Sequence, residues 1–347
     1  MNLKKIITIF SVLLITGLIV YGYILYRDIF GANTKFSENE VYIYIPTDSD
    51  YEAVKKIVTP YIDNMSRFEM VANKKSYPDR AEKAGRFILK KGMNSNEIVN
   101  ALRINIPVNL AFNNQERLEN FAGRIGSQIE ADSLSLLTAF KDKKFLEENG
   151  FTEENVLSMF VPNSYEFFWN TNANKFRDKM SKEYRKFWTD ARLEKAKLLN
   201  LTPIQVSILA SIVHKETVKR DERPKVAGVY LNRLQRGIKL EADPTVIYAV
   251  KLKSGDFNQV IKRVLYKDLE TDSPYNTYKY EGLPPGPIAM PDITALEAVL
   301  NPEKHNYIYF CASVTNFGYH EFAVTTAQHE VNRQKYVAWV NQQGIKR

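Results

Sequence analysis

Residues 202–217 read TPIQVSILASIVHKET, and this stretch decides how the C-terminal half of the chain folds. Thr202 is a residue type that caps helices, and Pro203 suits the first helical position. Apolar residues then recur at helical spacing, at Ile208, Leu209, Ile212 and Val213. The pattern predicts a helix that begins at residue 203 and buries an apolar stripe in a core.

Glu216 is the unusual residue of this predicted helix. At about 100° per residue, its side chain falls in the middle of the apolar stripe, whereas His214 points to nearly the opposite side. A carboxylate on a buried face loses hydration, and burial raises its pKa toward the range that a general acid needs. The alternative is a structural role, with Glu216 at a frayed helix end, paired with Lys219 or Arg220.

The composition is that of an ordinary globular protein. The chain has 347 residues, 44% hydrophobic and 25% charged, which suggests two or three domains. The net charge is +8, but the basic residues are scattered, so we expect no nucleic-acid partner. Cys311, the single cysteine, lies in an apolar stretch that reads as a buried strand, which favours a core residue over a nucleophile. No Cys/His cluster has metal-ligand spacing and no phosphate-binding loop occurs, so we expect no cofactor.

An uncharged run from Ile6 to Tyr26 follows Lys4 and Lys5 near the N-terminus. Its 21 residues are enough to cross a bilayer as a helix. A cleaved signal peptide would have a shorter apolar core, whereas this run continues through tyrosines suited to a membrane interface. We therefore predict an uncleaved transmembrane helix at 6–26, with residues 1–5 in the cytoplasm and the rest of the chain outside.

Residues 27–40 are polar and read as a tether. After them, alternation and periodicity predict a strand at 40–46, a helix at 50–59, a strand at 85–89 and a helix at 97–102. This order predicts a small α+β module over residues 40–105.

Residues 106–200 read as a mostly helical connecting region. Helical periodicity occurs at 133–140, 144–149, 153–160 and 173–199. An aromatic, proline-kinked stretch lies at 160–170. Such clusters are usually core, but Tyr165 and its polar neighbours also give the mixture found in sugar-binding grooves. Tyr165 is therefore a candidate substrate contact.

Residues 201–347 read as a mixed α/β domain. After the helix at 203–220, we expect helices at 225–236, at 246–250 and near 289, strands at 307–312 and 320–323, and a helix from Thr326. The sequence GLPPGPI at 282–288 reads as a rigid loop, because prolines fix φ and glycines allow unusual turns. Asp243 begins the motif DPT and is interpreted as a loop organiser or helix cap.

Five motifs in this order resemble the YceG-like, or endolytic murein transglycosylase, family. They are ASIVHKET at 210–217, KVA…LNRL at 225–234, DPTVIY at 243–248, YNTY at 275–278 and GLPPGPI at 282–288. The resemblance is strong over roughly the last 150 residues and weaker toward the N-terminus. It implies an α+β protein with an N-terminal transmembrane helix, a LysM-like glycan-binding module at 40–105, a helical region at 106–200 and a catalytic domain at 201–347.

The resemblance also implies site residues. The family's catalytic glutamate lies in the K-E-T triplet, here Glu216, which the apolar stripe had already singled out. Implied substrate contacts are Tyr275, Asn276, Tyr278, Asn232, Arg233 and Asp243. For Arg233 a salt bridge with a nearby acid is an equal alternative. The sequence departs from the family at His214, where the family has glutamate, and at Gln328-His329-Glu330, where it has E-H-N.

The implied activity is endolytic cleavage of the β-1,4 bond between N-acetylmuramic acid and N-acetylglucosamine, leaving 1,6-anhydro ends. The implied partners are glycan strands, the membrane and peptidoglycan synthases, with the catalytic domain on the periplasmic side. Two alternatives stay open. Asp243 could serve a two-carboxylate muramidase that uses water. The chain could also be a non-catalytic glycan-binding scaffold, for which a carboxylate on an apolar stripe has no use.

Overall fold

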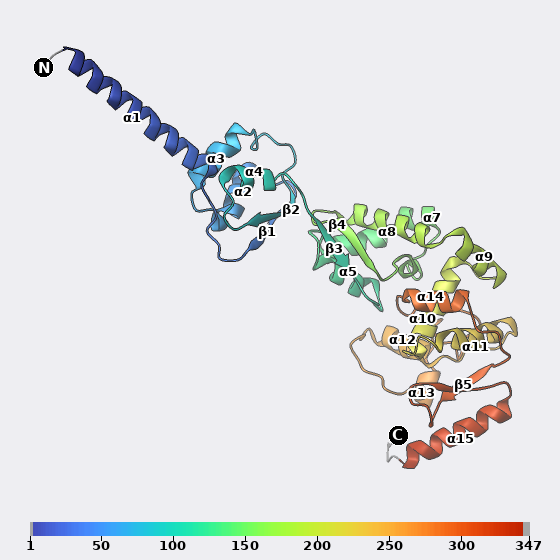
Figure 1. Cartoon of the computed structure of the whole chain (residues 1–347). Helices are drawn as coiled ribbons and strands as arrows, with labels where there is room; N and C mark the ends of the chain where they lie inside the picture. Colours follow the sequence, from blue (N-terminus) through green and yellow to red (C-terminus); the bar gives the residue numbers. More distant parts are fainter. Residues whose placement is uncertain (1–2, 343–347) are drawn as a thin grey trace. The chain divides into compact units, whose positions relative to one another are not determined.

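The computed structural model describes residues 3–342 and is a mixed α+β protein (Figure 1). The chain divides into two compact units. The first contains the chain up to Leu110 and two short returns, 127–131 and 165–172. The second contains residues 111–126, 132–164 and the chain from Ala173 onward.

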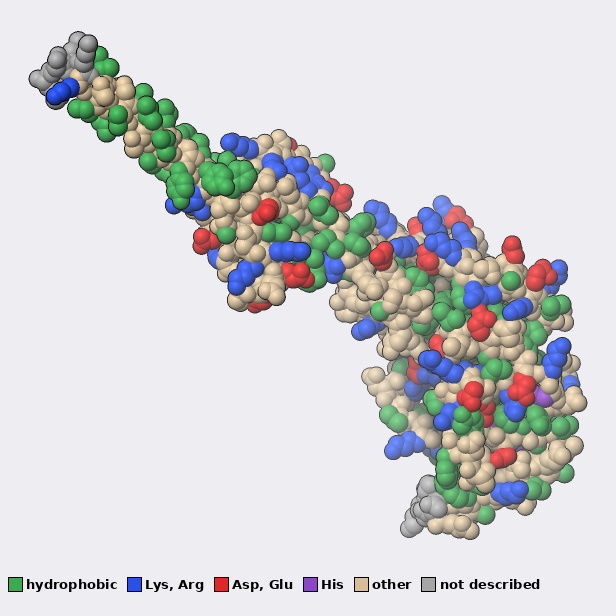
Figure 2. All heavy atoms as spheres, viewed as in Figure 1, with side chains coloured by type: hydrophobic (Ala, Val, Ile, Leu, Met, Phe, Trp, Pro, Cys, Tyr) green, Lys and Arg blue, Asp and Glu red, His purple; other side chains and the backbone are tan. Residues whose placement is uncertain are grey.

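The N-terminal helix α1 (Leu3–Phe30) is apolar over its whole middle. Its segment Ile7–Phe30 has a mean hydropathy of 2.2 and is long enough to cross a membrane. The side chains of this segment are mostly exposed, and Figure 2 shows the apolar ones covering the helix. A helix with no buried face in a soluble core is consistent with the predicted span.

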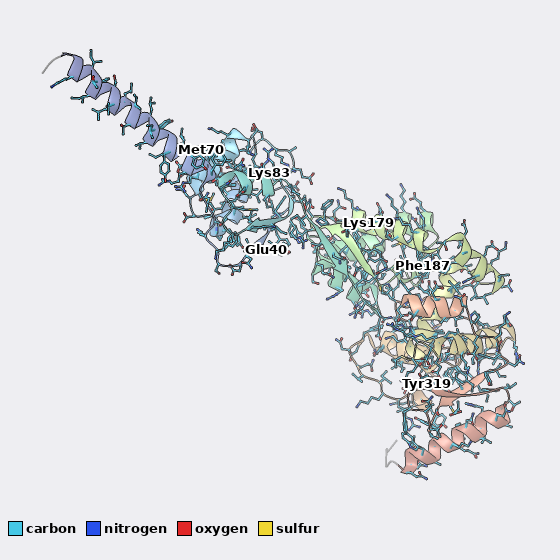
Figure 3. The ribbon with its side chains drawn as sticks, viewed as in Figure 1. Glu40, Met70, Lys83, Lys179, Phe187 and Tyr319 are labelled. Atoms are coloured by element: carbon cyan, nitrogen blue, oxygen red, sulfur yellow. The ribbon has the colours of Figure 1, made fainter. Side chains whose placement is uncertain are left out.

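The rest of the first unit is built on an antiparallel pair of strands, β1 (Glu40–Ile45) and β2 (Gly85–Lys90). Between the strands lie α2 (Tyr51–Val58), the 3₁₀ turn η1 (Thr59–Tyr61) and α3 (Met65–Lys74), and α4 (Ser95–Ala101) follows β2. Figure 3 labels Glu40 at the start of β1, Met70 on α3 and Lys83 just before β2. The predicted strands and helices are confirmed, but α3 was not predicted.

The prediction of a tether at 27–40 is wrong. Helix α1 continues to Phe30, and Asp28 pairs with Arg67 of α3 at 2.8 Å. Asn33 is fully buried and its side chain donates to Ser95 Oγ and to the carbonyl oxygen of Asn64, both at 2.9 Å. These residues are polar because they bond to backbone groups of the unit, which composition alone cannot distinguish from solvation.

The middle of the chain is less helical than predicted. Strands β3 (Pro107–Ala111) and β4 (Ser164–Phe168) pair as a two-stranded sheet. The helices are α5 (Leu118–Gly126), α6 (Ser133–Phe140), α7 (Lys143–Asn149), η2 (Val156–Met159), α8 (Ala173–Phe187) and α9 (Asp190–Leu198). The single helix predicted at 173–199 is broken after Phe187, labelled in Figure 3, because Thr189 adopts an extended conformation at the start of α9.

Helix α10 (Pro203–Glu216) is the central element of the second unit. It contacts α11 (Arg223–Gln235), α12 (Asp243–Ser254) and α14 (Ile293–Leu300), which lie around it in Figure 1. Thr202 caps it through a capping box with Gln205, and Pro203 occupies its first turn, as predicted. All residues from 206 to 213 are buried, so the helix is buried on every side rather than along one stripe.

The C-terminal elements follow the predicted order. They are α14, β5 (Tyr309–Ala312), β6 (His320–Ala323) and α15 (Thr326–Gln342), and before them lies the short helix α13 (Tyr266–Leu269), which was not predicted. Strands β5 and β6 form an antiparallel hairpin in which Ala312 lies opposite His320. Strand β5 is partly exposed rather than buried, so Cys311 is a half-buried residue instead of the core residue predicted.

The rigid loop at 282–288 is fixed by a close backbone approach. A Cβ atom on Gly286 would overlap the backbone carbonyl of Glu154, which cannot move aside as a flexible side chain could. We expect Gly286→Ala to lower the free energy of unfolding by about 1–3 kcal/mol. Gly123→Ala, in α5 with open space around the new Cβ, is the matched control and should stabilise the chain by about 0.5–1 kcal/mol. Thermal unfolding of both variants tests this, and equal effects would contradict it.

Candidate active site

Glu216 is the last residue of α10, and the next residue, Thr217, is extended and buried. The Glu216 carboxylate accepts a hydrogen bond of 2.5 Å from the hydroxyl of Tyr230 on α11. Tyr230 is 1% exposed, so it holds the carboxylate from inside the core. Glu216 does lie at the helix end, as the structural alternative supposed, but its hydrogen-bond partner is Tyr230 rather than Lys219 or Arg220.

The environment of Glu216 favours the protonated acid. Burial, helped by the negative charge of Asp243, raises the pKa of Glu216 to about 7. The Tyr230 hydrogen bond and the charge of His320 act in the opposite direction. A carboxyl group that titrates near neutral pH can both donate and accept a proton in one catalytic cycle.

A second acid and a second tyrosine lie in the same electrostatic neighbourhood. Asp243, exposed at the start of α12, accepts a hydrogen bond of 2.7 Å from the hydroxyl of Tyr278. Of the two roles predicted for Asp243, the helix cap is wrong, because Ala242 occupies the cap position, whereas the bond to Tyr278 fits a loop organiser. Burial raises the pKa of Tyr278, and the charges of Asp243 and Glu216 add to it. Glu216, Tyr230, Asp243 and Tyr278 are therefore the group that the fold brings together.

The neighbours of Tyr278 in the YNTY motif make contacts within the fold. Asn276 is fully buried, and its amide donates to the carbonyl oxygens of Leu269 and Thr271, both at 2.8 Å. Its Oδ1 accepts the backbone N–H of Tyr278 at 3.0 Å. Tyr275 is 6% exposed and packs on Tyr248 with 4.7 Å between ring centroids. In this structure Asn276 supports the backbone of Tyr278 and Tyr275 packs on Tyr248, and the sugar contacts of both residues stay a prediction.

The side chains of Asn232 and Arg233 also form hydrogen bonds within the fold. Asn232 donates to the carbonyl oxygens of His305 and Tyr307 at 2.8 and 2.9 Å. Arg233 is 5% exposed, donates to the carbonyl oxygen of Ile308 at 2.8 Å and pairs with Glu241. The salt-bridge alternative for Arg233 is confirmed, because its guanidinium already lies against an acid inside the fold.

Tyr165 belongs to the first compact unit, on β4, whereas Glu216 belongs to the second. The substrate contact predicted for Tyr165 therefore stays a prediction.

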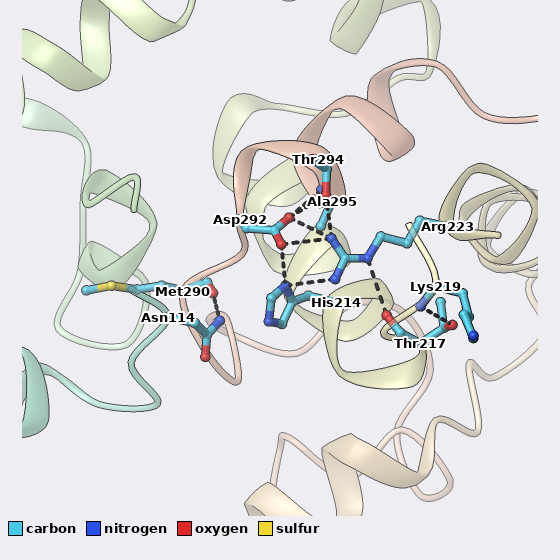
Figure 4. A network of polar contacts seen from close by, with 9 residues as sticks. All are labelled: Asn114, His214, Thr217, Lys219, Arg223, Met290, Asp292, Thr294 and Ala295. Atoms are coloured by element: carbon cyan, nitrogen blue, oxygen red, sulfur yellow. Dashed lines mark hydrogen bonds and ion pairs between the residues drawn. The ribbon is translucent and has the colours of Figure 1, made fainter. Parts of the chain in front are cut away.

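His214 takes part in a separate polar network, drawn in Figure 4. Its Nδ1 lies 3.4 Å from Asp292 and 3.4 Å from a guanidinium nitrogen of Arg223. Burial alone would raise the pKa of Asp292, but hydrogen bonds from His214 and Arg223 hold it well below its ordinary range. His214 thus has different partners from Glu216, as the helical projection predicted.

The second departure from the family motif lies on α15. Gln328 accepts the backbone N–H of Val324 at 3.1 Å, and His329 stacks on Tyr309 with 4.9 Å between ring centroids. Glu330 pairs with Arg333 one turn later at 2.7 Å. The contacts of Gln328 and His329 attach the first turns of α15 to the β5–β6 hairpin, whereas the Glu330–Arg333 pair lies within the helix.

Three residues near Glu216 were missed by the sequence reasoning: Tyr230, Glu222 and His320. Tyr230 has the apolar spacing of an ordinary core residue, so its hydroxyl gave no signal. Glu222 and His320 are almost 100 residues apart in the chain but bond through two contacts, at 2.7 and 2.9 Å. Only the folded β5–β6 hairpin reveals this pair. Among residues 3–342 there is no group of three His, Cys, Asp or Glu side chains that could hold a metal ion.

Comparisons with known proteins agree with this fold. The sequence matches the YceG-like family over residues 43–335. It is 28% identical to the endolytic murein transglycosylase of Bacillus subtilis over 350 residues, which cover 95% of this chain and 93% of that protein. It is 37% identical over 138 residues to the endolytic murein transglycosylase of Streptococcus pneumoniae, covering 40% of this chain and 24% of that protein.

A structural relative has also been solved. The 2.6 Å crystal structure of a yceG-like protein from Listeria monocytogenes matches with a TM-score of 0.55 and 27% identity. The match covers 85% of this chain and 99% of that one. Since the family match extends over most of the sequence, the chain belongs to the YceG-like family.

Proposed function

We propose that this chain is a membrane-anchored, endolytic peptidoglycan lytic transglycosylase with Glu216 as its acid and base. The observation that carries the proposal is the carboxyl group of Glu216, whose pKa burial raises to about 7 and which Tyr230 holds in place. It lies in a chain similar to proteins named endolytic murein transglycosylases. The bond cut is the β-1,4 link between N-acetylmuramic acid and N-acetylglucosamine.

The reaction needs one group that first donates and then accepts a proton. Protonated Glu216 gives its proton to the glycosidic oxygen as the bond from that oxygen to the muramic C1 breaks. The resulting carboxylate takes the proton of the muramic 6-hydroxyl as this oxygen bonds to C1. The product is a 1,6-anhydro end, Glu216 is protonated again, and no water is consumed.

A single carboxylate suffices because the nucleophile is part of the substrate. An ordinary glycosidase uses a second carboxylate as nucleophile or to activate water. Here the attacking hydroxyl is already tethered, which removes much of the entropic cost of bringing it to C1. Asp243, bonded to Tyr278, has the role of a neighbouring charge that favours protonated Glu216.

The remaining predicted residues have supporting roles in this proposal. Tyr278 and Asp243 bind the sugars beside Glu216, while Tyr275, Asn276, Asn232 and Arg233 hold the surrounding loops. Tyr165 contacts the glycan strand outside this group.

The first unit supplies the anchor and a glycan contact. Helix α1 spans the plasma membrane, with the catalytic unit on its outer, periplasmic side, close to peptidoglycan synthases. Residues 40–105 form the LysM-like module, supported by their compact α+β core and by two tyrosine rings on β1, Tyr42 and Tyr44, that are 42% and 43% exposed. Exposed rings are suitable platforms for sugar faces.

The test is digestion of purified peptidoglycan by the full chain in detergent micelles, with the products identified by mass spectrometry. We expect anhydro-muramyl ends. Reducing ends would overturn the transglycosylase in favour of a muramidase and would give Asp243 the task of activating water. Binding to peptidoglycan without any cleavage, by folded protein, would favour the scaffold.

A further inference from the structure

The strongest feature outside the proposed acid and base is the buried pair formed by Glu222 and His320. Glu222 lies in the turn between α10 and α11 and is 6% exposed. One oxygen of its carboxylate accepts the backbone N–H of His320 at 2.7 Å, and the other lies 2.9 Å from the Nδ1 atom of the same residue. Both oxygens are therefore occupied by a single residue of β6.

This geometry fixes the imidazole. Burial would raise the pKa of Glu222, but the hydrogen bonds from His320 outweigh it and keep the group ionised. An ionised carboxylate only accepts hydrogen bonds, so Nδ1 must carry the proton. Glu222 thus sets both the tautomer and the orientation of the His320 ring.

Ring contacts connect this imidazole to the acid. The Phe310 ring packs edge-on against His320, with 5.0 Å between centroids, and against Tyr230, with 5.7 Å between centroids. The hydroxyl of Tyr230 in turn bonds to Glu216. The loop before β6 is held as well, because Tyr319, labelled in Figure 3, bonds to Asp221 at 3.0 Å and lies under the ammonium group of Lys219.

We propose that His320, fixed by Glu222 and packed through Phe310 against the tyrosine that bonds to Glu216, is a positioning residue that prepares Glu216 to accept the muramic hydroxyl proton. The inference rests on the proposed function. His320 lowers the pKa of Glu216 while Asp243, on the opposing element α12, raises it. The charge of His320 favours the carboxylate form of Glu216, and the charge of Asp243 favours the protonated form. Glu216 must alternate between these two forms during the reaction.

Other charged or titratable groups belong to this environment. Glu216 faces Tyr230 on α11, and Asp243 and Tyr278 on the opposing elements. His320 faces Glu222, with Asp221 and Lys219 beyond Tyr319, and Lys225 lies over the ring of Phe322 on the same strand.

The experiment compares wild type with His320→Asn in the full chain in detergent micelles, between about pH 5 and pH 9. An asparagine amide can keep the hydrogen bond from the Nδ1 position to Glu222 but carries no charge. Without the imidazolium, Glu216 should stay protonated to higher pH. The alkaline limb of the rate of anhydro-end formation should therefore move upward, changing the ratio of variant to wild-type rates by about twofold or more across the limb. Asp243→Asn should move the limb in the opposite direction.

If the alkaline limb of the rate profile does not move in folded His320→Asn, the proposal is overturned, and the Glu222–His320 pair has only a structural role. Should that variant fail to fold, His320→Gln also removes the charge, with its amide nitrogen nearer the position of Nε2. A second readout does not need activity: the carboxyl carbon of Glu216 is titrated by NMR, with its signal assigned from its loss in Glu216→Gln. A titration midpoint that rises in the His320 variant supports the proposal, and an unchanged midpoint overturns it. Because this readout is independent of cleavage, failure of the transglycosylase reaction remains distinguishable from failure of the inference.

Discussion

Glu216→Gln should abolish the formation of anhydro ends, with a loss of about a thousandfold or more in rate. The amide has nearly the same shape and can still accept the Tyr230 hydrogen bond, but it can neither give a proton to the glycosidic oxygen nor take one from the muramic hydroxyl. Both halves of the proposed reaction therefore fail together. The measurement is the rate of anhydro-end release from peptidoglycan by mass spectrometry, for the full chain in detergent micelles.

The control is Glu194→Gln, which changes an exposed glutamate on α9 and should leave the rate unchanged.

Thermal unfolding of Glu216→Gln checks that the variant folds, and we also expect its stability to differ from that of wild type. The pKa of Glu216 is raised from 4.5 to about 7 in the folded chain, so folding disfavours the carboxylate. The resulting cost is absent at low pH, grows as pH rises through this interval and is complete above it.

Removing the carboxyl group should therefore stabilise the chain at pH 8 by up to about 3 kcal/mol, and should have little effect near pH 4. An active Glu216→Gln variant would contradict the assignment of Glu216. A variant that is inactive but no more stable at pH 8 than wild type would instead show that the carboxyl group is better solvated than the structure indicates.

Helix α10 was predictable because each signal within it is local. Thr202 and Pro203 mark its start, and the apolar spacing marks its burial. Glu216 was identified because a carboxylate is unusual within an apolar stripe that is expected to be buried. Strand β1 was found for the same reason, since the alternation along its six residues is visible without knowing its partner.

The rest of the site depends on contacts between distant parts of the chain. Tyr230 looks like any core tyrosine until α11 is packed on α10, and His320 is unremarkable until β6 meets the turn that holds Glu222. The buried Asn33 shows the same limit, because a polar residue that bonds to backbone groups has the sequence signature of a solvated linker. Tertiary hydrogen bonds of this kind leave no periodicity to detect.

The largest loss of stability is expected for Arg223→Ala. The guanidinium is 4% exposed and donates to both oxygens of Asp292 at 2.7 and 2.8 Å (Figure 4). It also donates to the carbonyl oxygen of Thr217, the residue after Glu216, at 3.3 Å. Removing one partner of a buried pair leaves the other charge uncompensated, which typically costs about 3–5 kcal/mol. Because the network joins α10, α11 and α14, the loss should appear as cooperative unfolding of the second unit at lower temperature.

The matched control is Arg333→Ala, which breaks an exposed pair with Glu330 on α15 and should cost less than about 1 kcal/mol. The pH dependence of the free energy of unfolding distinguishes Arg223→Ala from Arg333→Ala further. The pKa of Asp292 is depressed in the folded chain, so the stability it contributes is present above its ordinary value of 3.8 and is lost as pH falls below it. The deficit of Arg223→Ala should therefore shrink in acid, where wild type also loses the ion pair. Equal and small losses for both variants, at every pH, would mean that the network around His214 contributes no more than a surface pair does.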